Sequence, residues 1–416
     1  MAEIEIPQYF ICPISLQIMK DPVAAMTGIT YDRESIEQWL SMAKDHIIAC
    51  PVTKQPLTKQ SGLTPNHTLR RLIQAWCLAN ATNGVDRIPT PKSPLEISHV
   101  LKLVRDLEVP HLYQLALMKM KALAMENERN RSVMAEAGVA KALISLITRS
   151  FKEGRSSSTT CILEALRILR LVWSNPSSNI KPLVIENLEF INSLTWVLQE
   201  VHHDDHHKVV NEAMPVLQTT IRAASSSLLS RLKLEFFNEI VAVLKTHKLV
   251  QVSQQAIKSA LQVLIETCSI SSNRMKIVEA GAVFELVEIE LEKPEKNITE
   301  LVFEVLAHLC SCADGRERFL QHAGSIAVIS KRILRVSPAT SDRAVHILSL
   351  IAKFSASKEV VLEMLRIGAV TKLCMVMQAD CDDYLKAKVR GILRLHSSVW
   401  NNSPCIAVYL LTRYQR

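Results

Sequence analysis

The sequence lacks the ligands that a paired zinc site requires. Two closed structural zinc sites take about eight Cys or His ligands, about four for each ion. Residues 1–80 contain only Cys12, His46, Cys50, His67 and Cys77, and none of them pair at C-x-x-C spacing. The sequence therefore predicts an amino-terminal domain without metal or cofactor. A small apolar core, hydrogen bonds and ion pairs must hold it instead.

Glycine, aromatic residues and long apolar runs are also scarce. Gly contributes only 10 of 416 residues and aromatic side chains 5%, although 48% of residues are hydrophobic. Little glycine with abundant Leu, Ala, Lys and Glu favours helix over sheet. No segment approaches the roughly 18 apolar residues of a membrane-spanning helix, and no basic, apolar leader is present. We expect a soluble, intracellular, mostly α-helical protein with reduced thiols.

The charge of the chain is mildly basic, with a net charge of +8. Residues 1–80 are balanced, so the surplus lies in the remainder of the chain. Blocks of like charge and interleaved aromatics are both absent, which favours an ordinary helical surface over a nucleic-acid partner.

A proline-rich segment divides the sequence. Pro89, Pro91 and Pro94 fall within six residues, and proline both lacks a backbone donor and disfavours helix in the residue before it. The sequence therefore predicts a first domain over 4–79, a linker over 80–96, a second domain over 97–400 and a carboxy-terminal tail over 401–416.

The second domain contains a repeat. Its clearest copies are VMAEAGVAKALISLI from Val133, KIVEAGAVFELVEI from Lys276, FLQHAGSIAVISKRI from Phe319 and MLRIGAVTKLCMVM from Met364. Two degenerate copies put Glu189 and Glu235 at the position of the shared glycine. The six copies are 43 to 51 residues apart, and the residue five places further on is always apolar: Leu143, Leu194, Ile240, Leu286, Ile329, Leu373. A helical repeat in the forties is typical of armadillo or HEAT solenoids.

Each repeat suggests helices joined at the glycine. The shared position, occupied by Gly138, Gly281, Gly324 and Gly368, suits a sharp turn between two helices, because glycine has no Cβ to clash there. A short polar loop is predicted before it, for example at Glu128–Arg131 and Gly315–Arg318. The arginines of these loops fit either a solvated loop or a ridge that binds a partner. The units resemble armadillo repeats, whose helices line a groove for extended segments of partner proteins.

The first domain has its own local signals. Residues 21–31 predict a β-hairpin around Thr27 and Gly28, and Asp32 is well placed to cap a helix from Arg33 to about Ala43. A second helix is predicted over 67–78, and its apolar positions fall on one face: Leu69, Leu72, Ile73, Trp76.

These residues resemble a U-box over about residues 4–78. The resemblance rests on the segments Ile11-Cys12-Pro13-Ile14-Ser15-Leu16, Thr27-Gly28-Ile29-Thr30-Tyr31-Asp32-Arg33, Trp39-Leu40, Cys50-Pro51-Val52-Thr53 and Leu63-Thr64-Pro65-Asn66. The order of U-box, proline-rich linker and armadillo repeats resembles the plant U-box ubiquitin ligases. The expected fold is mostly α, with a small α+β, RING-like but metal-free domain followed by an armadillo-type α-solenoid.

The resemblance implies a ubiquitin-protein ligase that forms no covalent intermediate. Such a ligase docks a ubiquitin-charged conjugating enzyme and positions ubiquitin for attack by a lysine of a substrate that the repeats hold. Position by position, it implies a docking surface of Ile14, Leu16, Trp39, Pro51 and Lys54. Cys12, Pro13, Asp32 and Cys50 then have structural roles, since no base accompanies the cysteines. The implied partners are a conjugating enzyme, ubiquitin and a protein substrate, with no nucleic acid and no integral membrane segment.

Two alternatives stay open on the sequence alone. The chain could be a non-catalytic armadillo scaffold or transport adaptor rather than a ligase. Only an assay of ubiquitin transfer distinguishes these two functions. The run His202-His203-Asp204-Asp205-His206-His207 resembles a metal site, but a polar connector between repeat helices is favoured because adjacent residues cannot all face one ion. The resemblance also suggests a role in stress or immune signalling. We expect a cytoplasmic location, with the nucleus or a membrane surface as alternatives.

Overall fold

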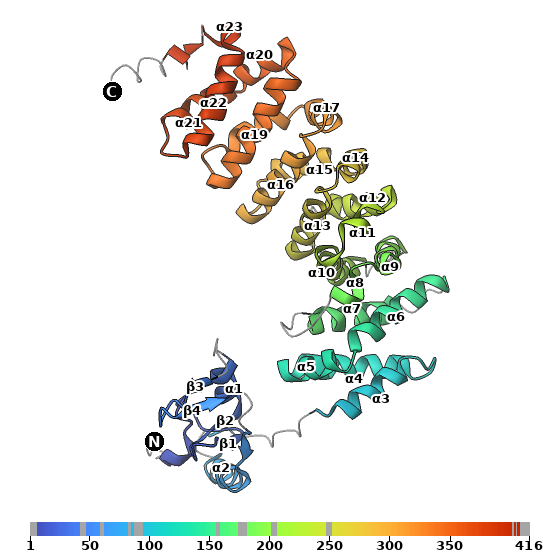
Figure 1. Ribbon diagram of the computed structural model, residues 1–416, viewed down its shortest axis with the longest axis vertical. Helices are drawn as coiled ribbons and strands as arrows, with labels where there is room; N and C mark the ends of the chain where they lie inside the picture. Colours follow the sequence, from blue (N-terminus) through green and yellow to red (C-terminus); the bar gives the residue numbers. More distant parts are fainter. Residues whose placement is uncertain are drawn as a thin grey trace. The chain divides into compact units, whose positions relative to one another are not determined.

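The chain forms two compact units, Met1–Pro94 and Leu95–Arg416 (Figure 1). The computed structural model describes residues 6–41, 47–58, 62–81, 85–86, 95–154, 159–173, 181–200, 206–246, 252–401, 403–404 and 406–407. Most of the predicted linker over 80–96 lies outside the described residues, as does most of the predicted tail over 401–416. The bounds of both segments therefore stay predictions.

The first unit is a small α+β fold. A 3-10 turn, η1 (Gln8–Phe10), precedes the hairpin of β1 (Pro22–Ala24) and β2 (Thr30–Asp32), and β5 (Thr64–Pro65) pairs with the other edge of β1. A separate antiparallel pair is formed by β3 (Ile47–Ala49) and β4 (Pro56–Thr58). Two helices complete the unit, α1 (Arg33–Ser41) and α2 (His67–Ala79).

The local signals of this unit are largely confirmed. Gly28 has a φ of +78° in the hairpin turn, the left-handed region that glycine enters freely. The side chain of Asn66 caps α2 by accepting a hydrogen bond from the backbone N–H of Leu69, at 3.0 Å. The buried core joins the hairpin, both helices and two cysteine-containing loops: Phe10, Cys12, Met19, Val23, Ala25, Tyr31, Ile36, Leu40, Cys50, Leu57, Ile73, Cys77.

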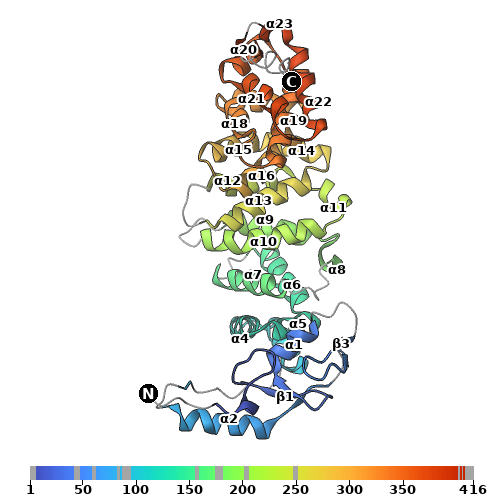
Figure 2. The same ribbon diagram turned by 90° about the vertical axis from the view of Figure 1, so that its left-hand side faces the viewer.

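The second unit is a stack of helices. It opens with α3 (Ile97–Asp106) and α4 (Tyr113–Glu126), and repeats of three helices follow (Figure 2). The first helices are α5 (Glu128–Glu136), α8 (Lys181–Val184), α11 (Ser226–Ser230), α14 (Ser271–Glu279), α17 (Ala313–Gln321) and α20 (Lys358–Arg366). The second helices are α6 (Val139–Lys152), α9 (Leu188–Glu200), α12 (Leu234–Lys245), α15 (Ala282–Leu291), α18 (Ser325–Arg332) and α21 (Ala369–Gln378).

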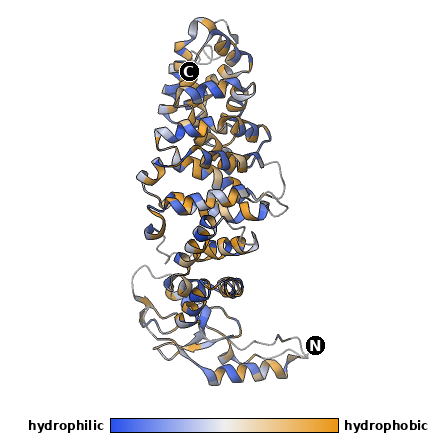
Figure 3. Ribbon diagram, turned by 90° about the vertical axis from the view of Figure 1, so that its right-hand side faces the viewer, coloured by the Kyte–Doolittle hydropathy of each residue, from blue (hydrophilic) through white to orange (hydrophobic). Residues whose placement is uncertain are grey.

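The third helices form a continuous row on the inner side of the curved stack (Figure 1). They are α7 (Thr159–Trp173), α10 (His206–Ala223), α13 (Gln254–Thr267), α16 (Lys296–Leu309), α19 (Pro338–Phe354) and α22 (Asp383–Leu395), and α23 (Ser397–Trp400) follows the last of them. Each helix carries both apolar and polar residues (Figure 3), and stacking buries the apolar stripe that one helix could not bury alone. Within the described residues no helix is long and apolar enough to cross a membrane.

The repeat register predicted from the sequence is confirmed by burial. The apolar residue five places after the shared position is buried in all six copies: Leu143, Leu194, Ile240, Leu286, Ile329, Leu373. The expected glycine turn is present in three copies, where Gly138, Gly281 and Gly368 have φ between +78° and +85°.

The other three copies depart from the predicted glycine turn. Gly324 has a φ of −90°, and its N–H donates to Nδ1 of His322 at 3.1 Å, so no left-handed residue is needed there. Glu189 and Glu235 lie in the first turns of α9 and α12 rather than between helices. These helices begin earlier, and a glutamate in the first turn is favourable there because it faces the positive end of the helix dipole.

The predicted polar loops before the glycine are helices instead. Asn130, Asn273 and Arg316 lie in α5, α14 and α17 and occupy one repeat position. Asn273 Nδ2 donates to the carbonyl of Leu229 at 3.0 Å, and Arg316 Nη1 donates to the carbonyl of Cys310 at 3.0 Å. These side chains are buried because they satisfy carbonyls at helix ends that have no partner within their own helix. For Arg316, the prediction of a solvated loop and the prediction of a partner-binding ridge are therefore both wrong.

Candidate functional site

The two Cys-Pro loops of the first unit have the same backbone conformation. In the segment Cys12–Gln17, the N–H of Leu16 donates to the carbonyl of Cys12 at 2.9 Å, and the N–H of Cys12 donates to the carbonyl of Gln17 at 2.8 Å. In Cys50–Gln55, the matching distances are 3.0 and 2.7 Å. The fifth residue of each loop, Leu16 or Lys54, has a positive φ, 54° or 61°. The sequences CPISLQ and CPVTKQ are therefore a structural duplicate.

The cysteine sulfurs lie beneath these loops as hydrogen-bond acceptors. Cys50 Sγ accepts from the N–H of Thr53 at 3.4 Å and lies 2.9 Å from the Tyr31 hydroxyl. Cys12 Sγ accepts from the N–H of Asp32 at 3.3 Å. Tyr31 and Asp32 are consecutive residues of β2, so one strand fixes both loops.

The thiols are electrostatically unlike ordinary cysteines. Burial opposes ionisation of Cys50, but hydrogen bonds from Thr53, Tyr31 and Thr27 outweigh it and lower the Cys50 pKa to about 6. Burial likewise opposes ionisation of Cys12, and hydrogen bonds again lower its pKa below the ordinary value. Burial raises the pKa of Tyr31, so its hydroxyl stays protonated and can donate to the Cys50 sulfur. The sulfurs of Cys12 and Cys50 therefore act as hydrogen-bond acceptors within the fold.

The contacts of Asp32 differ from the predicted helix cap. Its Oδ1 accepts from the N–H groups of Lys20 and Asp21, at 2.7 and 2.8 Å. The carboxylate thus ties the end of β2 to the segment that leaves the first loop. Charged donors and acceptors make hydrogen bonds about twice as strong as neutral ones, which suits a tie between a strand and a loop.

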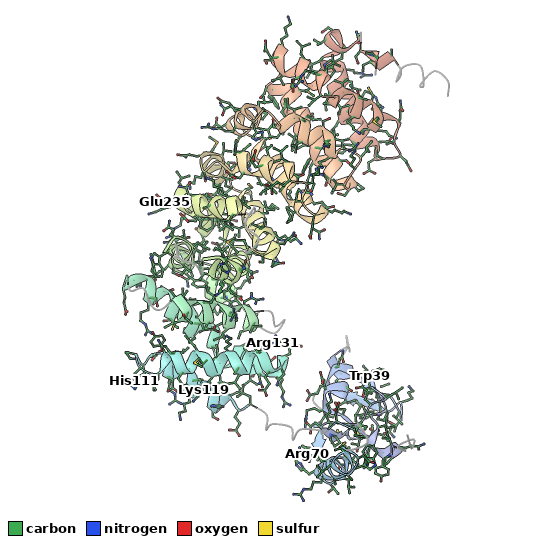
Figure 4. All side chains as sticks on the ribbon, turned by 180° about the vertical axis from the view of Figure 1, so that it is seen from behind. Trp39, Arg70, His111, Lys119, Arg131 and Glu235 are labelled. Carbon is green, nitrogen blue, oxygen red and sulfur yellow. The ribbon has the colours of Figure 1, made fainter. Side chains whose placement is uncertain are left out.

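An ion-pair cluster that the sequence reading missed supports the same corner. Arg33 Nε donates to Asp21 Oδ2 at 2.6 Å, Arg33 also lies 3.6 Å from Glu37, and Arg70 of α2 lies 3.8 Å from Asp21. Figure 4 shows Arg70 on the α2 side of this unit. The signal was available, because Asp21 directly precedes β1 and Arg33 directly follows β2, and antiparallel strands bring such ends together.

The predicted docking residues lie at the surface of the loops and of α1. Leu16 is 76% exposed, an unusual position for a leucine, while Ile14 and Trp39 pack partly against the core. The indole Nε1 of Trp39 (Figure 4) donates to the carbonyl of Ala49 at 3.1 Å, which places α1 beside the start of the second loop. Pro51 and the exposed Lys54 complete that loop, and Lys54 Nζ donates to the Pro51 carbonyl at 3.0 Å. Pro13 is exposed beside Cys12.

Metal ligation was predicted for neither unit. Among the described residues, no group of three or more His, Cys, Asp or Glu side chains is arranged to hold an ion. Of the sequence run that resembled a metal site, residues His202–Asp205 lie outside the described part of the chain, and α10 begins at His206.

Comparison with known families identifies both units. The family described as the plant U-box protein ARM repeat region matches residues 96–416, and the U-box domain matches residues 6–82. The chain belongs to the plant U-box proteins with armadillo repeats. The U-box match covers the loops, the hairpin and α2, and the repeat match covers the helical stack.

Relatives from Arabidopsis thaliana match the chain over nearly its full length. The E3 ubiquitin-protein ligase PUB24 is 42% identical, with 99% of this chain and 96% of the relative covered. The E3 ubiquitin-protein ligases PUB23 and PUB22 are 39% and 38% identical, each with 99% of this chain covered and with 98% and 99% of the relative. The predicted function, a ubiquitin-protein ligase of the U-box type, is confirmed at the level of the family. Membership implies a conjugating enzyme and ubiquitin as partners of the U-box, and substrate binding by the repeats.

Solved structures match the helical stack. An engineered protein shares 19% identity at a TM-score of 0.51, covering 72% of this chain and 68% of its own. The structure of Uso1-2 shares 14% identity at a TM-score of 0.52, covering 74% of this chain and 52% of its own. At such identities the likeness concerns the fold alone. Together with the family match, it confirms the predicted α-solenoid.

Proposed function

We propose that the two Cys-Pro loops and α1 form the docking surface for a ubiquitin-charged conjugating enzyme. Ile14 and Leu16 on the first loop, Trp39 on α1, and Pro51 with Lys54 on the second loop make this surface. Catalysis then consists of holding the charged enzyme so that a substrate lysine reaches the thioester, which is a positioning effect. The attacking nucleophile is the substrate lysine, and the buried Cys12 and Cys50 stay outside the reaction.

The observation that carries this proposal is the exposure of Leu16 on a fixed backbone. A leucine that is 76% exposed contributes nothing to the core. Its left-handed backbone also costs free energy, about 1–2 kcal/mol for a residue with a side chain. Strain of this kind is found where a partner uses the side chain, and an exposed apolar group on a rigid loop is what an interface anchor requires.

Lys54 holds the matching position of the second loop. Its ammonium group is exposed and donates a hydrogen bond to the nearby Pro51 carbonyl at 3.0 Å. A lysine in this position can donate hydrogen bonds to carbonyl groups of the carboxy-terminal segment of ubiquitin. We propose this role for Lys54 in the charged complex.

Discharge of a conjugating enzyme to free lysine tests the docking surface. Ile14→Ala and Trp39→Ala in the full chain are expected to lower the rate at least tenfold, because each removes an apolar contact at the centre of the interface. Leu72→Ala on α2 is the matched control, since Leu72 is also exposed, at 51%, but lies outside the loops. Circular dichroism must show unchanged helicity. Wild-type rates for both Ile14→Ala and Trp39→Ala would contradict the assignment.

We propose that the row of third helices binds the substrate. Side chains of this row pair from one repeat to the next, as Arg167 with Glu212 at 3.1 Å and Arg343 with Glu304 at 2.7 Å. Such pairs are partly exposed and worth little for stability, so they can exchange partners with a bound segment. Reversing the charges of Arg167 and Arg170 in a full-length Ile14→Ala chain is expected to reduce substrate capture.

The family match and the ligase relatives argue against the alternative of a non-catalytic scaffold or transport adaptor. We further propose a cytoplasmic protein that acts in stress or immune signalling. Fractionation and fluorescence imaging of the tagged full chain test the location, and a predominantly nuclear or membrane-bound signal would contradict it.

A further inference from the structure

The first helix pair of the repeat domain has an open face. Along the stack each second helix packs on the next second helix and each third helix on the next third helix, as α6 on α9 and α7 on α10. The pair α3 and α4 packs in the same way on α6 and α7. Its opposite faces point towards the position that a preceding repeat would occupy, and α3 is the first helix among the described residues of this unit.

This open face is apolar where a polar one is expected. Terminal repeats of solenoids normally present a polar outer surface, which keeps the protein soluble. Here Met118 and Met125 of α4 are 66% and 64% exposed, and Leu115 is 50% exposed. On α3, Ile97 and Leu101 are 46% and 42% exposed. We call these five residues the α3–α4 face, and an apolar patch of this kind marks an interaction site.

Three exposed basic side chains accompany the α3–α4 face. Lys102 and Arg105 of α3 are exposed, and so is Lys119 of α4, which is labelled in Figure 4. None of the three has an ion pair to any residue in the described part of the chain. The acids of this helix pair lie at helix ends: Glu96 precedes α3, Asp106 ends α3 beside Arg105, and Glu126 ends α4. The middle of the face is therefore apolar and cationic.

We propose that the α3–α4 face binds an amphipathic helix of a partner protein that carries acidic side chains beside its apolar stripe. A helix is the natural occupant, because it continues the helix-on-helix packing of the stack. Methionine side chains adapt to different apolar surfaces, which suits a face that binds in trans. A second copy of this chain is a poor occupant, since it would place Lys102, Arg105 and Lys119 of both copies opposite one another.

This interaction is separate from the docking loops and from the substrate surface on the third helices. It gives the ligase a partner site at the end of the repeat domain to which the linker leads. A helix bound there would be held in addition to a substrate on the third helices. The proposal stands whether or not the five docking residues act as proposed above.

A pair of synthetic peptides tests the proposal on the full-length chain. The first is a fluorescein-labelled peptide of eighteen residues with leucine in a helical stripe and glutamate on both flanks, and its twin has lysine in place of glutamate. Fluorescence anisotropy measures binding at low and high salt. We expect the glutamate peptide to bind at least tenfold more tightly than its twin, and this preference to shrink at high salt because the cations are exposed.

Charge reversal makes the test specific to the face. The double variant Lys102→Glu/Lys119→Glu is expected to reverse the preference, and Met118→Glu to weaken binding of both peptides at least tenfold. Lys296→Glu/Lys358→Glu, at exposed positions of α16 and α20, is the matched control and should bind as the wild type does. Equal affinity for the two peptides, unchanged binding by the double variant, or no binding of either peptide would overturn the proposal. So would a homodimer that Met118→Glu dissolves.

Discussion

The two units of this ligase are stabilised by different means. In the U-box, consecutive residues of β2 hold two loops through sulfur and carboxylate acceptors, and the strained residues Leu16 and Lys54 project from those loops. In the repeat domain, the same buried apolar positions recur from copy to copy, as at Leu143 and Leu286. Polar contacts are directional and fix a surface in one geometry, whereas stacked apolar stripes tolerate variation from one copy to the next.

The difference explains where each unit can vary. The repeat domain keeps its register even where the glycine turn is lost, as at Glu189 and Glu235, because burial rather than turn geometry sets the packing. The U-box tolerates less variation, because the conformation of each loop depends on one sulfur acceptor and a few hydrogen-bond donors. Substitutions in the two units should therefore produce different kinds of loss, and this comparison can be tested.

The largest expected effect is a cavity in the repeat domain. Leu306 of α16 is fully buried, so Leu306→Ala should cost about 2–5 kcal/mol in the free energy of unfolding of this unit. Hydrogen exchange of amides in the third helices measures that loss. Leu362→Ala, at a leucine that is 45% exposed on α20, is the control and should change little. Discharge of the conjugating enzyme to free lysine should stay at the wild-type rate, and a fall in that rate would mean that the units are not energetically separate.

A smaller loss of stability is expected when the buried polar residue shared by the repeats is replaced. Asn273→Ala removes two buried hydrogen bonds, which the side-chain amide donates to the carbonyls of Leu229 and Thr267. At about 0.5–1.5 kcal/mol for each bond, the loss should be about 1–3 kcal/mol. Thermal unfolding of the full chain measures it, with Asn297→Ala at an exposed position of α16 as the control. If Asn273→Ala and the control unfold alike, the shared position is not a structural feature of the repeat.

The fold was more predictable from the sequence than the site was. Helix periodicity and the 43-to-51-residue spacing identified the stack, because apolar burial leaves a regular trace in sequence. The polar position of Asn273 and Arg316 was misread as a loop, because its partners are main-chain carbonyls at the ends of other helices, which no local pattern reveals. Tyr31 was not recognised as a partner of Cys50, because their contact spans 19 residues and depends on the fold.

Removal of the Tyr31 hydroxyl should have a moderate effect on the U-box alone. Tyr31→Phe keeps the buried ring and loses the hydrogen bond to Cys50 Sγ, at an expected cost of about 0.5–1.5 kcal/mol. Hydrogen exchange of U-box amides should show this loss while the amides of the repeat domain are unchanged. Equal loss in both units would contradict the separation of their stabilities.

The Cys50 thiol makes the stability of the U-box depend on pH. Hydrogen bonds lower its pKa in the folded state to about 6. A depressed pKa stabilises the fold above the ordinary pKa of cysteine, and this contribution fades as the pH falls towards 6. The U-box should therefore gain stability from pH 6 to pH 9, as measured by urea unfolding of the full chain, and Cys50→Ser should reduce the gain. An identical pH dependence in the variant would show that Cys50 does not ionise in this range.

The smallest expected change in stability comes from Leu16, where backbone strain and the exposed side chain can be tested separately. Leu16→Gly removes both the side chain and the cost of the positive φ of 54°, whereas Leu16→Ala removes the side chain and keeps that cost. The glycine variant should thus be more stable than the alanine variant by up to about 1 kcal/mol, because the greater freedom of glycine in the unfolded chain offsets part of the relief. Both variants should lose transfer from the conjugating enzyme to the same extent, since both lack the exposed leucine. Hydrogen exchange of U-box amides measures the difference in stability, and discharge to free lysine measures the loss of transfer. Full activity in Leu16→Gly would mean that the backbone of the loop, rather than its leucine, contacts the enzyme.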